Sequence, residues 1–75
     1  MSKKTTNLEQ EIFIGIVMDE TGLELGKIKF FTPRQMGCAE EDLAEICENV
    51  EKILNVDISD IFSMDTIVRE IIEIF

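Results

Sequence analysis

Apolar residues recur every three or four positions between residues 40 and 55, and this spacing constrains the fold more than any other feature of the chain. They are Leu43, Ile46, Cys47, Val50, Ile53 and Leu54. Such spacing gathers apolar side chains on one side of an α-helix. We therefore predict a helix from about Ala39 to Asn55, preceded by a turn at Gly37, that packs its apolar side against a core.

The other side of this predicted helix is acidic, with Lys52 as its only basic residue. The acidic residues are Glu40, Glu41, Asp42, Glu45, Glu48 and Glu51. Carboxylates in the first turn of a helix are stabilised by the positive end of the helix dipole, which accounts for the acids at 40–42. The remaining acids indicate either a solvated surface or a surface that docks a basic partner.

Length and composition predict one small helical domain. Chains divide into several domains only well beyond 75 residues. Hydrophobic residues make up 45% of the chain, which is too many for a disordered segment. With no tryptophan or tyrosine and a single proline, the core is expected to be aliphatic and helical.

The formal net charge of -9 lies in the second half of the chain. Residues 1–39 contain five basic and five acidic residues, whereas residues 40–75 contain two basic and eleven acidic residues. An acidic surface repels nucleic acid and anionic membranes and attracts basic protein surfaces. We therefore expect a protein partner with a basic docking patch, and neither nucleic acid nor a membrane.

The sequence favours a cytoplasmic location. No segment has the features of a signal peptide, and none reaches the roughly 18 consecutive apolar residues needed to span a bilayer. Cys38 and Cys47 lack the spacing of a CxxC metal site and need no disulfide in a reducing compartment.

Residues 1–5 are predicted to be a disordered tail, and residues 6–75 a single domain. Thr6, with Glu9 three residues later, predicts a capping box at the start of a helix from about Asn7 to Glu20. Gly22 is predicted to end this helix in the left-handed conformation. The expected buried side chains are Leu8, Ile12, Phe13, Ile16 and Val17.

Residues 23–35 fit neither the helical nor the strand period for long. A short strand is one interpretation, but a lone strand has no partner to pair with, so we predict a long loop over the core. Thr32 precedes Pro33 and therefore avoids helical backbone angles.

Residues 56–63 are predicted to form a single helical turn, and Asp65 or Thr66 to cap a final helix. That helix carries Ile67, Val68, Ile71, Ile72, Ile74 and Phe75, and is expected to lie wedged in the core. The predicted fold is therefore all-α: a bundle of three main helices and one short helix, with a long loop between the first two helices.

Catalysis has few candidate groups, because the chain contains no histidine. No nucleophile lies beside a base, and no glycine-rich phosphate loop is present. Asp57, Asp60 and Asp65 lack the spacing, glycine and closing glutamate of a calcium loop. We therefore predict neither an enzyme nor a metal site, and we assign Cys47 to the core.

The order of these parts resembles the acyl and peptidyl carrier protein family, over about Leu8 to Phe75. The matching features are Gly22 with Leu23, Ile28 and Phe31 in the long loop, Met36-Gly37, the acidic helix, Val56-Asp57-Ile58, and Phe62 with Thr66-Ile67. The resemblance implies an acyl-carrier-protein-like four-helix bundle.

The chain departs from this family where the family carries its cofactor. In the family, a Leu-Gly pair and one further residue precede an Asp-Ser-Leu triplet, and the serine carries phosphopantetheine. Here Met36-Gly37 matches the pair, and Ala39-Glu40-Glu41 takes the place of the triplet. The carboxylate of Glu40 cannot form the phosphodiester, so no cofactor is expected. The changes at Ala39 and Glu41 favour a natural loss over an engineered serine-to-glutamate substitution.

The resemblance leads to a protein-interaction module that has lost its phosphopantetheine site. Its partner would be a protein such as a biosynthetic synthase, ligase or acyltransferase. The residues expected to contact that partner are Glu41, Asp42, Ala44, Glu45 and Glu48.

Two alternatives remain open. The first is a functional acyl or peptidyl carrier in fatty-acid, polyketide or nonribosomal-peptide-type biosynthesis, modified at Cys38 or at Ser63. Cys38 lacks neighbours that stabilise a thiolate, and a helix starting after Ser63 would have no further helix to cover it. The second is a regulatory adaptor unrelated to lipid or peptide synthesis.

Overall fold

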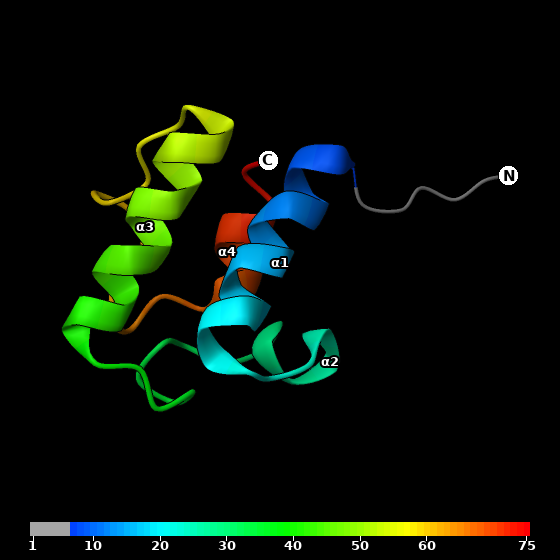
Figure 1. Cartoon of the computed structure of the whole chain (residues 1–75). Helices are drawn as coiled ribbons and strands as arrows, with labels where there is room; N and C mark the ends of the chain where they lie inside the picture. The colour runs from blue at the N-terminus through cyan, green and yellow to red at the C-terminus, as the bar shows by residue number, and fades with distance from the viewer. Residues whose placement is uncertain (1–6) are drawn as a thin grey trace, which may run out of the picture.

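The chain folds into helices joined by hydrogen-bonded turns (Figure 1). The computed structural model describes residues 7–75, so the predicted tail, residues 1–5, and the predicted cap Thr6 lie outside the described residues. Within 7–75 there is no β-strand, as predicted, and the helices are α1 (Leu8–Thr21), α2 (Leu25–Ile28), α3 (Glu40–Leu54) and α4 (Val68–Ile72).

Only α1 and α3 are long, so the prediction of three main helices was wrong. Figure 1 shows α1 and α3 side by side and running in opposite directions, with α4 packed behind α1. The third expected helix is reduced to α4, which has five residues. No helix in this part of the chain is long and apolar enough to cross a membrane.

Helix α1 begins at Asn7, one residue after the predicted cap Thr6. The Asn7 Oδ1 atom accepts the backbone N–H of Gln10 at 2.7 Å, and Gln10 Oε1 accepts the backbone N–H of Asn7 at 3.0 Å. This reciprocal pair is a capping box that uses glutamine instead of the predicted Glu9. The helix ends as predicted at Gly22, whose φ of 73° is left-handed and whose N–H donates to the Met18 carbonyl.

The buried side of α1 differs from the predicted one. Phe13 and Val17 are buried as expected, and Ile14 is buried as well. Leu8 is 71% exposed, because its first-turn position lies outside the packed core. Several helices contact α1, so its apolar spacing alone does not select one buried side.

The predicted loop at residues 23–35 contains a turn of helix, α2. The carbonyl of Glu24 accepts the N–H groups of Lys27 and Ile28, and the Ile28 side chain is fully buried. The turn is fixed by this tertiary contact, because a helix of four residues does not persist alone. Phe30 and Phe31 remain exposed instead of covering the core.

The start of α4 is capped by this loop and not by Asp65 or Thr66. Its N-cap residue, Ile67, makes no capping bond through its side chain. Instead the N–H of Val68 donates to the Phe31 carbonyl at 2.9 Å, and the N–H of Arg69 donates to the Lys29 carbonyl at 3.1 Å. These bonds satisfy amides that a helix start leaves without partners.

The end of α4 is tied to the start of α1. The Asn7 side-chain amide donates to the Phe75 carbonyl at 2.8 Å, and the Gln10 amide donates to the Ile72 carbonyl at 2.9 Å. Helix α4 is therefore held at both ends by segments remote in sequence. Its apolar residues Val68, Ile71 and Ile72 are buried, whereas Ile67 and Ile74, which were predicted to belong to the same helix, lie beyond its ends and are exposed.

Residues 55–66 cross back beside α3 and contain at 58–62 the predicted single helical turn, which is too short to count as a further helix. Asn55 ends α3 in the left-handed conformation, with φ of 62°. The Ile58 carbonyl then accepts the N–H groups of both Ile61 and Phe62, which closes a tight turn. Ile58 and Phe62 are buried and fasten this segment to the core.

Phe13 lies at the centre of a mainly aliphatic core, as the composition predicted. Its ring contacts the Phe62 ring edge to face, with centroids 5.9 Å apart, and the Phe75 ring at 5.4 Å. Among the described residues no polar or charged side chain is buried. Besides Pro33, the buried side chains are those of Phe13, Ile14, Val17, Ile28, Ile46, Cys47, Val50, Ile58, Phe62, Val68, Ile71 and Ile72.

Alanine substitutions at two isoleucines of α3 test which side chains contribute to this core. Both belong to the predicted apolar stripe, but Ile46 is 0% exposed and Ile53 is 59% exposed. We expect Ile46→Ala to lower the free energy of unfolding by about 2–5 kcal/mol, because it removes buried methylene groups and leaves a cavity. The matched control Ile53→Ala should change it by about 0.5 kcal/mol or less. Urea denaturation measures both, and equal losses would contradict the two exposures.

Candidate functional site

The first turn of α3 contains three consecutive acids, Glu40, Glu41 and Asp42. The N-cap residue is Ala39, whose side chain has no acceptor atom for the free amides. Asp42 supplies the other half of a capping box, because its Oδ2 accepts the Ala39 N–H at 2.8 Å. Asp42, predicted to contact a partner, therefore also stabilises its own helix.

The residue that the resemblance aligns with the carrier-protein serine, Glu40, is the first residue of α3. Glu40 is exposed there, between exposed Ala39 and Glu41. The side chain is a carboxylate and has no hydroxyl group to esterify. A phosphate brought to this turn would meet three negative charges.

Cys38 lies two residues before Glu40 and is half-buried. Burial, together with the carboxylates of Asp42 and Glu20, raises the pKa of the Cys38 thiol. A raised pKa keeps the sulfur protonated, whereas the thiolate is the nucleophile. This environment disfavours the interpretation of Cys38 as a thioester carrier.

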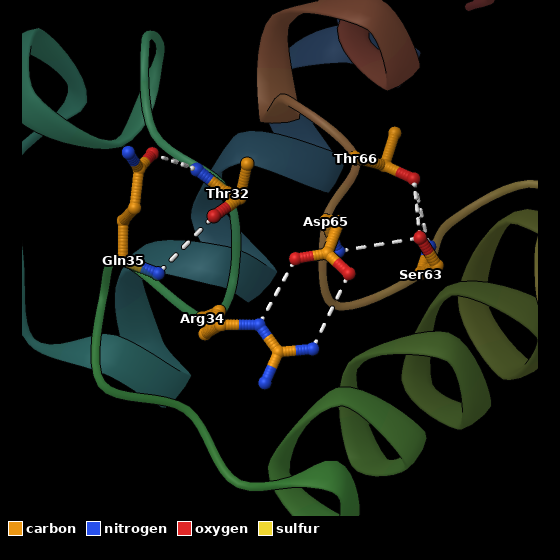
Figure 2. Close-up of polar contacts among 6 residues, drawn as sticks. All are labelled: Thr32, Arg34, Gln35, Ser63, Asp65 and Thr66. Atoms are coloured by element: carbon orange, nitrogen blue, oxygen red, sulfur yellow. Dashed lines mark hydrogen bonds and ion pairs between the residues drawn. The ribbon is translucent and has the colours of Figure 1, made fainter.

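Ser63 lies in a turn where its hydroxyl group is already hydrogen-bonded (Figure 2). Its Oγ lies 2.9 Å from Thr66 Oγ1 and accepts the backbone N–H of Asp65 at 3.3 Å. The Thr66 hydroxyl also accepts the backbone N–H of Ser63 at 2.9 Å. These side chains build the turn before α4, which accounts for Ser63 without an attached group.

A forked ion pair joins the loop before α3 to the same turn (Figure 2). Arg34 donates from Nε to Asp65 Oδ1 at 2.9 Å and from Nη2 to Asp65 Oδ2 at 3.3 Å. These bonds to Arg34 lower the pKa of the Asp65 carboxyl. The backbone N–H of Arg34 also donates to the Met64 carbonyl, so side chain and backbone connect the two segments.

A groove of about 550 Å³ lies between one flank of α3 and residues 57–64. Its acidic lining residues are Glu40, Glu48, Glu51 and Asp57. Its other lining residues are Leu43, Ala44, Cys47, Ser59, Phe62, Ser63 and Met64. We call it the α3 groove; it combines an apolar surface with four carboxylates.

The opposite flank of α3 also carries acidic side chains. Glu41, Asp42 and Glu45 line a smaller hollow there. Burial of the half-buried Glu20 of α1, followed by the carboxylates of Glu45 and Asp42, raises the pKa of the Glu20 carboxyl. Like charges from two helices therefore meet on this flank.

The predicted partner-binding residues consequently belong to two surfaces. Ala44 and Glu48 line the α3 groove. Glu41, Asp42 and Glu45 lie on the flank toward Glu20. Ala44 and Glu48 lie three positions after Glu41 and Glu45, so the two surfaces adjoin along α3, and the segment at residues 57–64 makes one of them a groove. The structure divides these residues between the two surfaces, and their contact with a partner stays a prediction.

The predicted partner-binding residues did not include three carboxylates of the groove: Glu40, Glu51 and Asp57. Glu40, Ala44, Glu48 and Glu51 follow helical spacing, which was available as a signal. Asp57 comes from the segment after α3, and no local pattern places that segment against the helix. Its Oδ1 accepts the N–H and the Oγ–H of Ser59 at 3.0 and 2.7 Å, bonds that lower the pKa of the Asp57 carboxyl.

The pKa of Glu20 predicts how stability depends on pH. A carboxyl whose pKa is raised by folding binds its proton more tightly in the folded state, so stability rises as pH falls through the folded pKa toward the unfolded one. We expect Glu20→Gln to raise the urea midpoint at neutral pH and to reduce the gain in stability between about pH 7 and about pH 5.

Asp19→Asn is the control for this experiment. Asp19 also lies in the last turn of α1, where a negative charge opposes the helix dipole, and it is exposed. If both variants gain the same stability, the effect comes from the helix end and not from the carboxylates of α3.

The site as a whole offers carboxylates and apolar side chains, groups suited to binding cations and apolar groups. Within residues 7–75, no three histidine, cysteine, aspartate or glutamate residues are grouped to hold a metal ion. No protein-family model, curated protein or solved structure matches the chain.

Proposed function

We propose that this chain is an acyl-carrier-protein-like domain without a phosphopantetheine site, which acts as a protein-interaction module through α3. The order of elements supports the first part of the proposal. A long helix, a loop, an acidic helix, an irregular segment and a short final helix follow in the order that the resemblance implies. The loss of the cofactor is supported by the exposed carboxylate of Glu40 at the attachment position.

The observation that carries the proposal is the unneutralised charge of α3. Five of its six acidic residues are exposed, and Asp42 is half-buried. Within residues 7–75 the two ion pairs are Arg34–Asp65 and Arg69–Glu73, neither of which involves α3. Unpaired surface charges of one sign attract a surface of opposite sign and increase the rate of encounter. A protein with a basic docking patch, such as a synthase, ligase or acyltransferase, fits this surface.

A cytoplasmic location is part of the proposal. Its support is that Cys38 and Cys47 are both free thiols, which suits a reducing compartment. The proposal includes neither an enzymatic activity nor a bound cofactor.

The proposed loss of the phosphopantetheine site is tested by mass spectrometry. Incubation of the protein with a phosphopantetheinyl transferase and coenzyme A should leave its intact mass unchanged, because Glu40 has no hydroxyl group to accept the arm. The triple variant Ala39→Asp, Glu40→Ser, Glu41→Leu restores the carrier-protein triplet and serves as the matched control; it should gain one phosphopantetheinyl group.

A gain of mass by the wild-type chain would reverse the proposal in favour of a functional carrier. Fragmentation of the modified protein would then locate the adduct at Cys38, at Ser63 or elsewhere. The intact mass of the protein purified from its source cells supplies the same test without added enzyme.

The proposed binding of a protein partner by α3 is tested by charge reversal on that helix. With a partner crosslinked and purified from the source cells, the triple variant Glu41→Lys, Glu45→Lys, Glu48→Lys should associate about tenfold more slowly at low salt and lose most of its salt dependence. The control Glu9→Lys, Glu24→Lys, Glu70→Lys changes the net charge equally at exposed positions outside α3. Equal association rates for the two triple variants would show that the acidic helix is merely solvated.

A further inference from the structure

The α3 groove combines two kinds of surface that select different parts of one ligand. Its apolar residues are Leu43, Ala44, Cys47, Phe62 and Met64, and its carboxylates come from Glu40, Glu48, Glu51 and Asp57. No basic residue lines it. A ligand that fills the groove must therefore bring both an apolar group and positive charge.

Its apolar surface comes from both walls. On α3, Leu43 is half-buried, Cys47 is buried, and the small side chain of Ala44 leaves space above them. On the other wall Phe62 is 2% exposed, so its ring belongs to the core and forms a fixed surface. Burial and the charge of Asp57 raise the pKa of the Cys47 thiol, which keeps this sulfur neutral. The groove thus contains a rigid apolar patch and not only solvated acids.

The carboxylates surround this patch from both sides. Glu40, Glu48 and Glu51 share one flank of α3, and Asp57 faces them from the next segment. The bonds from Ser59 hold the Asp57 carboxylate in place and ionised. The pKa of Arg34 is raised mainly by Asp65 and to a smaller extent by Glu40. The Arg34 guanidinium is already paired with Asp65. Within residues 7–75, no basic side chain forms an ion pair with this rim.

We propose that the α3 groove binds a basic segment of a partner protein, which inserts one apolar side chain against Ala44, Cys47 and Phe62 and pairs its flanking lysine or arginine residues with the four carboxylates. This inference rests on the proposed function and names the part of α3 that recognises the partner. A fatty acid, a nucleic acid or a second copy of this acidic chain would bring like charge to the rim. The groove volume of about 550 Å³ is sufficient for an aromatic side chain, since binding pockets span roughly 300–1,000 Å³.

A tryptophan peptide provides a direct probe, because the chain itself contains neither tryptophan nor tyrosine. The probe is a synthetic helical peptide about four turns long, with one tryptophan flanked by lysines on one side and alanine elsewhere. Insertion into the groove should shift the tryptophan emission to shorter wavelength. A peptide with glutamate in place of lysine should not bind.

Two variants three positions apart on α3, one lining the groove and one lining the hollow on the other flank, locate the site. Glu48→Lys lines the groove and should weaken peptide binding by about three- to tenfold, because it removes an ion pair and adds a like charge. Glu45→Lys makes the same charge change on the other flank and should have a smaller effect. Ala44→Leu fills the groove without changing charge and should reduce the emission shift. Circular dichroism confirms that each variant remains folded.

The outcomes separate this inference from the proposed function. A larger loss of affinity in Glu48→Lys than in Glu45→Lys, with a reduced shift in Ala44→Leu, supports the groove. If Glu45→Lys weakens binding as much or more, or Ala44→Leu leaves the shift unchanged, the groove is not the docking site, although α3 can still bind partners through its other flank. Absence of peptide binding also overturns the inference, while the charge-reversal test with the purified partner decides the proposed function independently.

Discussion

Burial of the Phe13 ring is the interaction on which the arrangement of the helices depends. Phe13 lies in the middle of α1 and contacts Phe62 and Phe75, which come from the segment after α3 and from the end of the chain. Aromatic contacts of this kind add about 0.5–1.5 kcal/mol beyond the area that they bury. Phe62 also forms one wall of the α3 groove, so the contact that closes the core also places the proposed docking surface.

Backbone hydrogen bonds between remote segments complete the fold. The carbonyls of Lys29 and Phe31 accept the first amides of α4, the side-chain amide of Gln10 donates to its last carbonyl, and that of Asn7 donates to the Phe75 carbonyl beyond it. A helix of five residues has too few internal bonds to form alone. Helix α4 thus depends on its surroundings, whereas α1 and α3 have their own caps and α3 also has its own apolar side.

The concentration of negative charge on α3 opposes folding and is the basis of the proposed binding function. Carboxylates of α1 and α3 meet on the flank toward Glu20, and such self-repulsion destabilises the compact state. A basic partner would relieve part of it. On the other flank, the carboxylates surround an apolar patch and are held apart by the groove. The two flanks give the proposed interaction module two distinct surfaces, and the carboxylate at Glu40 makes binding a better proposal than carriage of a phosphopantetheine arm.

The sequence by itself determined the all-α class, the aliphatic core, the end of α1 at Gly22, and α3 to within a residue of its limits. Each is encoded by a local signal: periodic apolar spacing, or a residue suited to a helix end. Only the tertiary structure decided that Ile46 is buried and Ile53 is exposed, that α2 forms around Ile28, and that backbone carbonyls cap α4. It also divided the acidic residues between a flank facing Glu20 and a groove completed by Asp57, because these contacts join segments whose proximity no local pattern specifies.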